Sequence, residues 1–133
     1  MTHLEPRIYL ASKSPRRREL LAQIGVHFDL MLFRAGTRED PETNENSRPA
    51  ETPDDYVSGV AIAKAKHGAR LIGIRRLALR PVLAADTTLD IDGEIVGKPK
   101  DEQDAMAILA RLSGRTHRVL TSVAVAHGER VEE

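Results

Sequence analysis

Hydrophobic residues occur along the chain in short extended runs that alternate with stripes of helical spacing. The runs that are typical of strands cover residues 7–11, 26–33, 81–91 and 117–128. Between the first two runs, Ser14 and Pro15 provide a helix N-cap followed by proline at the first helical position, and Gly25 provides a stop. Strand, helix and strand within about 30 residues predict a βαβ unit.

Two further helices follow the same rules. Thr52 and Pro53 begin a helix that runs to about residue 72, and Asp101 begins another that ends at Gly114. The second of these helices presents one apolar face, formed by Ala105, Ile108, Leu109 and Leu112. The polar segment 34–51 predicts a long loop before the first of them.

The second half of the chain predicts antiparallel strands. The dipeptide Asp92-Gly93 is a hairpin-turn signal after the strand at 81–91, and a short apolar run follows it. The final residues 127–133 fit either a turn that leads into a partner strand or a polar tail. Together the elements predict an α/β fold, with a mixed twisted sheet and flanking helices in a single domain over residues 1–133.

Composition narrows the class of protein. Hydrophobic residues make up 41% and charged residues 30% of the 133 positions, as in ordinary globular domains. Lys plus Arg equals Asp plus Glu at 20 each, and aromatic residues are only 3%, which argues against a nucleic-acid or membrane-surface binder. There is no cysteine, no apolar run near the roughly 20 residues of a membrane span, and no signal-peptide core at the N-terminus. We therefore expect a cytoplasmic protein in which any anion recognition depends on local charge.

Three consecutive arginines, Arg16 to Arg18, occupy the first turn of the helix that begins at Pro15. This is the positive end of the helix dipole, where acidic side chains are favoured. Helical spacing puts Arg17 on the apolar face, so it is expected to point inward, with Arg16 beside it. Arginines next to the free N–H groups of a helix N-terminus predict a phosphate site, whereas a solvated cluster paired with Glu19 is the structural alternative.

Lys64 and Asp86 are charged residues at positions where the pattern predicts burial. Lys64 lies within the apolar stripe of the helix that begins at Pro53, so its ammonium group either extends to the surface or meets a charged partner. Asp86 follows an apolar run in the strand at 81–91, and its carboxylate needs either a cation or loop N–H donors. Acids at strand ends of α/β folds often face a ligand.

Two weaker candidates lie in loops. Lys98 is flanked by Gly97 and Pro99, which restrict the shape of its loop, and Glu45 lies in the polar segment 34–51. No histidine pairs with another histidine at metal-ligand spacing, so a zinc site is not predicted. The glycine motifs of P-loop and Rossmann nucleotide sites are also absent from the sequence.

Four stretches of the chain resemble the Maf family of nucleotide pyrophosphatases, and they occur in the family's order. They are LASKSPRRRELL (10–21), DDYVSGVAIAKA (54–65), VLAADTTLDIDGEIVGKPKD (82–101) and LSGRTHRVLTSVAV (112–125). The resemblance implies a fold of the Maf and inosine-triphosphatase type. The patterns SPRR, with Arg16, and ADT, with Asp86 and Thr87, resemble the subtype that hydrolyses dTTP and UTP.

The resemblance also implies a role for each matching residue. Asp86 would be the general base that activates water, and Glu45 and Asp86 would hold a divalent cation, Mg²⁺ or Mn²⁺. The triphosphate and the base would be bound by Ser12, Arg16, Arg17, Lys64, Thr87 and Lys98. The implied reaction cleaves a nucleoside triphosphate between its α and β phosphates and releases pyrophosphate. The family is linked to removal of non-standard nucleotides and to cell-division arrest, and the resemblance also implies a homodimer.

Departures from the family's pattern motivate a second hypothesis. Asn44 stands where the family usually has Asp, and Gly59 stands where it often has Arg. The chain also lacks the family's C-terminal third, with its DKAGAY.IQG stretch, so a truncated form of the fold is expected. The alternative to an active pyrophosphatase is therefore a non-catalytic relic or regulator that at most binds nucleotide.

Overall fold

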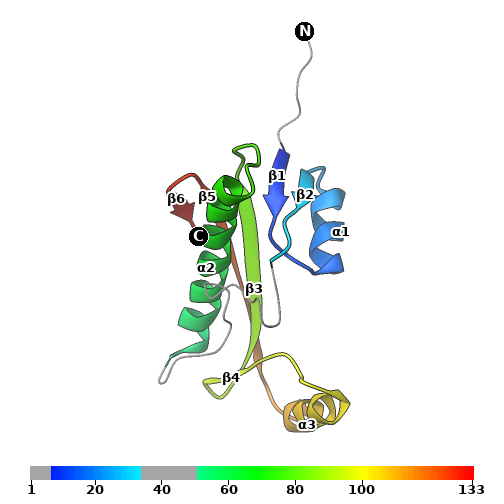
Figure 1. Cartoon of the computed structure of the whole chain (residues 1–133). Helices are drawn as coiled ribbons and strands as arrows, with labels where there is room; N and C mark the ends of the chain where they lie inside the picture. The colour runs from blue at the N-terminus through cyan, green and yellow to red at the C-terminus, as the bar shows by residue number, and fades with distance from the viewer. Residues whose placement is uncertain (1–6, 34–50) are drawn as a thin grey trace.

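The computed structural model describes residues 7–33 and 51–133, and Figure 1 shows their arrangement. The helices in these segments are α1 (Pro15–Gln23), α2 (Pro53–Ile74) and α3 (Glu102–Leu112). The strands are β1 (Arg7–Leu10), β2 (His27–Leu30), β3 (Val82–Ile91), β4 (Glu94–Val96), β5 (Arg118–His127) and β6 (Arg130–Glu132). The three predicted helix starts are confirmed, since Ser14, Thr52 and Asp101 each accept a hydrogen bond from a backbone N–H in the first turn.

These strands form one mixed sheet in the order β2-β1-β3-β5-β6, and β4 pairs with β3. The pairs of β1 with β2 and with β3 are parallel, whereas the pairs of β3 with β4 and β5, and of β5 with β6, are antiparallel. The predicted α/β class with a mixed sheet is thus confirmed. The strand predicted at 26–33 is shorter, and residues 127–133 form a turn and a strand rather than a polar tail.

The chain reverses its winding direction at β1. The connection through α1 leads from β1 to β2, and the connection through α2 returns to β3 on the other side of β1. Right-handed crossovers in opposite directions place α1 and α2 on opposite faces of the sheet, and in Figure 1 they flank the strands from opposite sides. In open α/β sheets, ligands bind at such a reversal, outside the carboxyl ends of the strands.

Pairing on the β1 side of β3 is interrupted. β1 covers only Val82 and Leu83, and β4 covers only residues 89–91. Residues 84–88 of β3 therefore have no strand partner on this side among the described residues, and we call them the open edge. On its other side, β3 pairs continuously with β5 from Val82 to Asp90.

Helix α2 packs closely on β3 and β5 because small side chains line the contact. These side chains, none of them exposed to solvent, are Ala61, Ala65, Ala84, Ala124 and Ala126. At Gly68 the approach is closest, since a Cβ atom there would lie 2.6 Å from Cγ1 of Val82. The contact therefore requires glycine at position 68, and it fixes the height of α2 above the sheet.

Helices α1 and α3 bury little of their apolar surface against the described residues. On α1, Leu20 is 43% exposed and the C-cap residue Ile24 is 73% exposed, whereas Leu21 is half-buried, so the described residues cover the apolar face of this helix only in part. The side-chain hydrogen bonds from α1 to β3 come from Arg17 in its first turn. On α3, Leu109 is 65% exposed. None of the helices in the described segments combines the length and the apolar composition needed to cross a membrane.

A charged cluster ties β3, β5 and α2 together near the α3 end of the sheet. Arg118 donates to the Asp90 carboxylate through Nε at 2.8 Å and through Nη2 at 2.5 Å, and Nη2 also donates to Asp54 of α2 at 3.1 Å. The Gly93 N–H donates to the other carboxylate oxygen of Asp90 at 2.7 Å. The Arg118 guanidinium, together with this N–H group, holds the pKa of Asp90 below its usual range.

Two glycines of α2 should respond in opposite ways to replacement by alanine. Gly59 is exposed and an added Cβ would meet nothing within 4 Å, so Gly59→Ala should raise the free energy of unfolding by about 0.5–1 kcal/mol. Gly68→Ala should lower it by about 1–3 kcal/mol, because the new Cβ would overlap the stiff side chain of Val82. Urea denaturation of both variants measures the difference, and effects of the same sign would contradict the packing described for α2.

Stability should depend on the Asp90 carboxylate in a defined pH range. Because the pKa of Asp90 is lowered in the folded state, its contribution is fully present above the unfolded-state value of about 4 and is lost as pH falls below that. The difference in unfolding free energy between the wild type and Asp90→Asn should therefore be largest at neutral pH and shrink as the pH falls below about 4. Urea denaturation across this range measures it, and a difference that does not vary with pH would contradict the assignment.

Candidate active site

Arg17 reaches from the first turn of α1 to the open edge of β3. Its Nη1 donates to the carbonyl oxygen of Ala85 at 3.1 Å and lies 3.5 Å from Ser12 Oγ, and its Nη2 donates to Thr87 Oγ1 at 3.2 Å. The prediction that Arg17 points inward from its helix is confirmed. The guanidinium thereby satisfies a backbone carbonyl at a place where no strand does so among the described residues.

The two serines of the β1–α1 loop organise the start of α1. Ser14 caps the helix by accepting from the Arg17 N–H at 3.3 Å, and Ser12 Oγ accepts from the Ser14 N–H at 3.0 Å. The positive end of the α1 dipole therefore lies just after the carboxyl end of β1, beside Arg17. A helix N-terminus with these donors is well suited to bind an anion such as phosphate.

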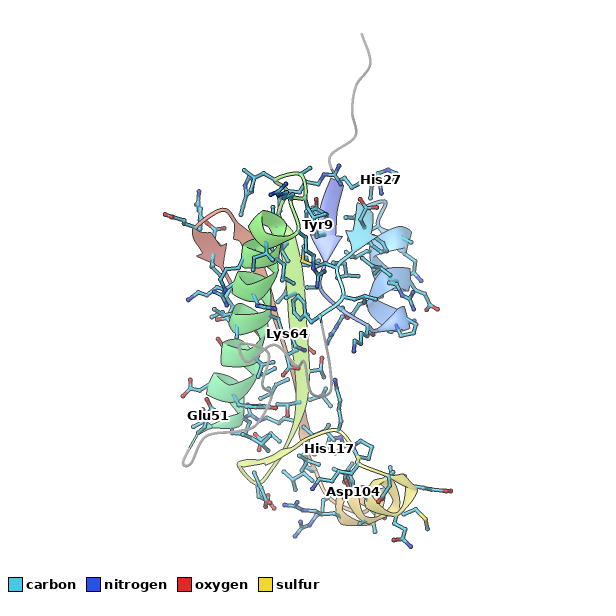
Figure 2. All side chains as sticks on the ribbon, viewed as in Figure 1. Tyr9, His27, Glu51, Lys64, Asp104 and His117 are labelled. Atoms are coloured by element: carbon cyan, nitrogen blue, oxygen red, sulfur yellow. The ribbon has the colours of Figure 1, made fainter. Side chains whose placement is uncertain are left out.

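Lys64 and Asp86 form a nearly buried ion pair between α2 and β3. Lys64 Nζ lies 3.7 Å from Asp86 Oδ1, and the two side chains are only 13% and 8% exposed. Figure 2 shows Lys64 on α2 alongside the sheet. Of the alternatives that the sequence leaves open, the charged partner of Lys64 and the cation beside Asp86 are therefore the ones present. The separation exceeds the roughly 2.7–2.9 Å of a charge-assisted hydrogen bond, so charge and packing hold the pair together.

The ion pair and the Arg17 contacts lie on opposite faces of the same stretch of β3. Successive side chains of a strand alternate between faces, so Asp86 faces α2 while Thr87 faces α1. Both residues belong to the open edge. A ligand that crosses this edge beyond the end of β1 can therefore contact both groups of side chains.

The ion pair and the Arg17 contacts do not include the other three predicted site residues. Arg16 is exposed and its Nη1 lies 3.7 Å from Glu19, with side-chain exposures of 72% and 63%, as in the solvated alternative. Lys98 is exposed between β4 and α3. Glu45 lies outside the described residues. The binding roles of these three residues stay predictions.

Two groups that contact Arg17 or its partner Thr87 do not stand out in the sequence. Ala85 contributes its backbone carbonyl, which no side-chain pattern reveals. Thr121 of β5 places its Oγ1 2.9 Å from Thr87 Oγ1. Alternation along β5 could have put Thr121 on the face opposite Ala124, but its pairing with Thr87 depends on a register that only the structure supplies.

These features define an α/β protein with a candidate anion site at the reversal point of its sheet. Arginine, lysine and helix N–H groups can offset the charge of phosphate groups, and a carboxylate can accept a proton from water. Within residues 7–33 and 51–133, His, Cys, Asp and Glu side chains form no group of three or more that could hold a metal ion. A site of this composition is typical of proteins that bind phosphate esters or anhydrides.

The chain belongs to the family of Maf-like proteins, whose model matches residues 7–133. It is 61% identical over 121 residues to the dTTP/UTP pyrophosphatase of Dechloromonas aromatica, covering 91% of this chain and 60% of that protein. It is 53% identical over 131 residues to the dTTP/UTP pyrophosphatase of Aromatoleum aromaticum, covering 98% of this chain and 64% of that protein. The chain thus spans about three fifths of the length of these relatives.

Solved structures support the fold. A nucleoside-triphosphatase, also described as a dITP/XTP pyrophosphatase, from Mycobacterium abscessus aligns with a TM-score of 0.54 at 19% identity, over 95% of this chain and 68% of that one. A HAM1 protein from Coxiella burnetii aligns with a TM-score of 0.54 at 19% identity, over 94% and 65%. These alignments confirm the expected inosine-triphosphatase type of fold, and they bear on the fold alone.

Burial should make the Lys64–Asp86 pair much stronger than a surface pair of the same length. A double-mutant cycle with Lys64→Met and Asp86→Asn should give a coupling free energy of about 1–3 kcal/mol, since each single variant leaves a charge nearly buried. The matched control is Arg16–Glu19, which has the same 3.7 Å separation but is exposed. Its cycle, with Arg16→Met and Glu19→Gln, should give about 0.5 kcal/mol or less.

Urea denaturation at neutral pH measures both cycles. Equal coupling in the two pairs would show that burial adds nothing to the Lys64–Asp86 interaction, and it would contradict the arrangement described for the open edge.

Proposed function

We propose that this protein is a nucleoside triphosphate pyrophosphatase that acts on dTTP and UTP. The observation that carries the proposal is the nearly buried Lys64–Asp86 pair at the open edge of β3, with Arg17 bound to the same stretch of strand. A carboxylate and two cations from separate elements meet at the place where α/β sheets bind ligands. The names of the relatives supply the substrate class.

In the proposed reaction, Asp86 accepts a proton from a water molecule as the water oxygen bonds to phosphorus. The bridging P–O bond between the α and β phosphates breaks, and pyrophosphate leaves with the bonding electron pair. Lys64, Arg17 and the N-terminus of α1 offset the negative charge that collects on the leaving group. Lys64 can serve both parts of the site, because its ammonium group lies 3.7 Å from Asp86 and carries three N–H donors.

The donor set at the open edge fits a divalent cation. Mg²⁺ is commonly held by one or two carboxylates together with substrate phosphates, and Asp86 offers a carboxylate beside the proposed phosphate site. Thr88, a residue that is 4% exposed, adds a buried hydroxyl that has no hydrogen-bond partner among the described residues. Asp86, with Glu45 of the loop, would hold the ion, which when bound would neutralise phosphate charge and lower the pKa of a water ligand.

Base selection is assigned to Arg16 and Thr87 by their match to the SPRR and ADT patterns. In the free protein Thr87 is exposed, and its hydroxyl accepts from Arg17 and bonds to Thr121 Oγ1, so one of its three hydrogen-bonding directions can still face a ligand. We place the reaction in the cytoplasm, where nucleoside triphosphates are available as substrates.

Replacing Asp86 with Asn should abolish most of the activity of the folded protein, and in the absence of urea the loss of the Lys64 partner should lower stability without unfolding the chain. With Mg²⁺ and dTTP or UTP, pyrophosphate release should fall by about 10²–10⁴-fold, as expected for loss of a general base. The assay measures pyrophosphate, with 7-methyl-GTP as the comparison substrate that should be turned over more slowly.

Asp90→Asn is the matched control, because Asp90 lies on the same face of β3 but is bound by Arg118. It should retain turnover at neutral pH. The proposal fails if folded wild-type protein releases no pyrophosphate, or if Asp86→Asn keeps the wild-type rate.

A further inference from the structure

We propose that Thr121 of β5 is a positioning residue that fixes the orientation of Thr87 and, through it, of Arg17. The inference rests on the proposed function, because it deepens the account of how the phosphate-binding arginine is set in place. A chain of hydrogen bonds runs from Thr121 Oγ1 to Thr87 Oγ1 at 2.9 Å and from Thr87 Oγ1 to Arg17 Nη2 at 3.2 Å. It links β5, β3 and α1 across the α1 face of the sheet.

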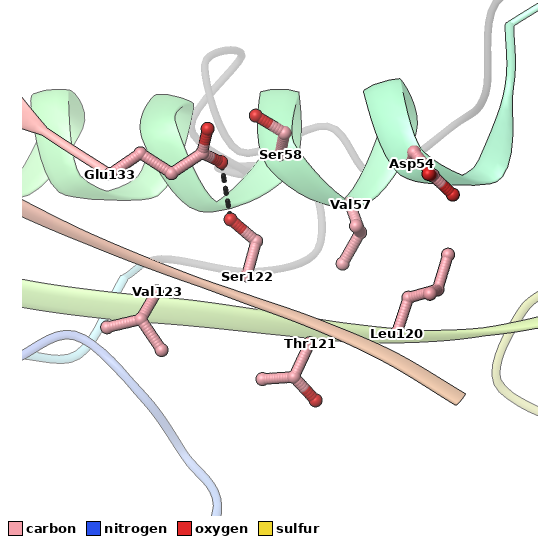
Figure 3. A pocket seen from close by; sticks show the side chains of 8 residues that line it. All are labelled: Asp54, Val57, Ser58, Leu120, Thr121, Ser122, Val123 and Glu133. Carbon is pink, nitrogen blue, oxygen red and sulfur yellow. Dashed lines mark hydrogen bonds between the residues drawn. The ribbon is translucent and has the colours of Figure 1, made fainter. Parts of the chain in front are cut away.

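The register of β3 and β5 makes this contact. Thr87 and Thr121 are direct cross-strand partners, so their side chains leave the same face of the sheet at adjacent points. Figure 3 shows Leu120 and Ser122 directed toward α2, and Thr121 and Val123 directed away from it. Thr121 therefore acts on the side of the sheet where Arg17 approaches, and not on the side of Lys64 and Asp86.

The number of donors and acceptors on a threonine hydroxyl explains how the contact with Thr121 orients Thr87. A threonine hydroxyl has one donor hydrogen and two acceptor lone pairs. Arg17 is always a donor, so it occupies one lone pair of Thr87. Whichever threonine donates in the Thr87–Thr121 contact, it restricts the rotation of the Thr87 hydroxyl and keeps a lone pair aimed at Nη2. Without Thr121, that hydroxyl can turn and donate to water instead.

A purely structural role would predict a different outcome. Both threonines are exposed, and their neighbour Val123 is 49% exposed, so the pair buries little apolar surface. An exposed cross-strand pair contributes only about 0.2–1 kcal/mol to stability, and valine suits a strand at least as well as threonine. Thr121→Val should therefore keep the fold, and a functional loss in this variant would not come from unfolding.

The test compares Thr121→Val with Thr121→Ser in the full chain. Thr121→Val should raise the KM for dTTP by about three- to tenfold, as for loss of one hydrogen bond. The kcat should stay within about twofold, because Thr121→Val leaves the Arg17 charge in place for the bound triphosphate and loosens only the orientation of Arg17 in the free protein. Thr121→Ser, which keeps the hydroxyl, should restore the wild-type KM. Val123→Thr, which adds a hydroxyl on the same face two residues away, is the matched control and should change neither constant.

A second readout does not depend on turnover. In ¹⁵N–¹H NMR spectra, the guanidinium signal of Arg17, assigned through Arg17→Lys, should show restricted Nη rotation in the wild type and in Thr121→Ser, and faster rotation in Thr121→Val. If the wild type releases no pyrophosphate, the proposed function fails, and this signal alone decides the role of Thr121. An Arg17 signal unchanged by Thr121→Val, or a KM change of the same size in Val123→Thr, overturns the inference.

Discussion

The close approach of α2 to the sheet is the constraint on which the site depends. Alanines on both sides of the contact, and Gly68 against Val82, leave no room for a larger residue at this point. The helix therefore runs near the backbone of β3. Lys64, one turn before Gly68, is held low enough over the strand for its ammonium group to lie 3.7 Å from Asp86. With bulky residues at the contact, α2 would stand farther from the sheet and the two charges would separate.

The same strand carries the stability of the sheet and the chemistry of the site. β3 is paired with β5 along nearly its whole length, which makes it rigid, yet its β1 side is free at residues 84–88. Polar side chains are grouped in this stretch: Asp86 and Thr88 face α2, and Thr87 faces α1. Continuous pairing on one side thus holds in place the groups that the interrupted pairing on the other side exposes to a ligand.

Much of this fold could be predicted from the sequence because its signals are local. Capping residues located the helix starts at Ser14, Thr52 and Asp101, and apolar runs located the strands. The inward direction of Arg17 also followed from helical spacing.

The contacts that complete the site are not local, however. The bond from Arg17 to the Ala85 carbonyl exists because β1 stops pairing at Leu83, and the sequence does not show where pairing ends. The sequence likewise could not decide whether the Lys64 ammonium group extends to the surface or meets a charged partner, because the distance between α2 and β3 is not a local property. Helical spacing predicts an apolar face but not what covers it, so the 73% exposure of Ile24 at the end of α1 could not be predicted.

The geometry also explains why arginine suits position 17 at the unfavourable end of a helix dipole. A strand that loses its neighbour leaves carbonyl groups to be satisfied, and Ala85 is only 7% exposed. A guanidinium group has five N–H donors in a fixed plane, and the contacts with Ser12, Ala85 and Thr87 use three of them. The plane is thus fixed by protein acceptors while other donors stay available to an anion. A lysine ammonium group has three donors and no plane, so the same acceptors would consume its capacity and leave its direction undefined. The charge repulsion at the start of α1 is therefore offset twice, by the acceptors at the open edge in the free protein and by phosphate in the proposed complex.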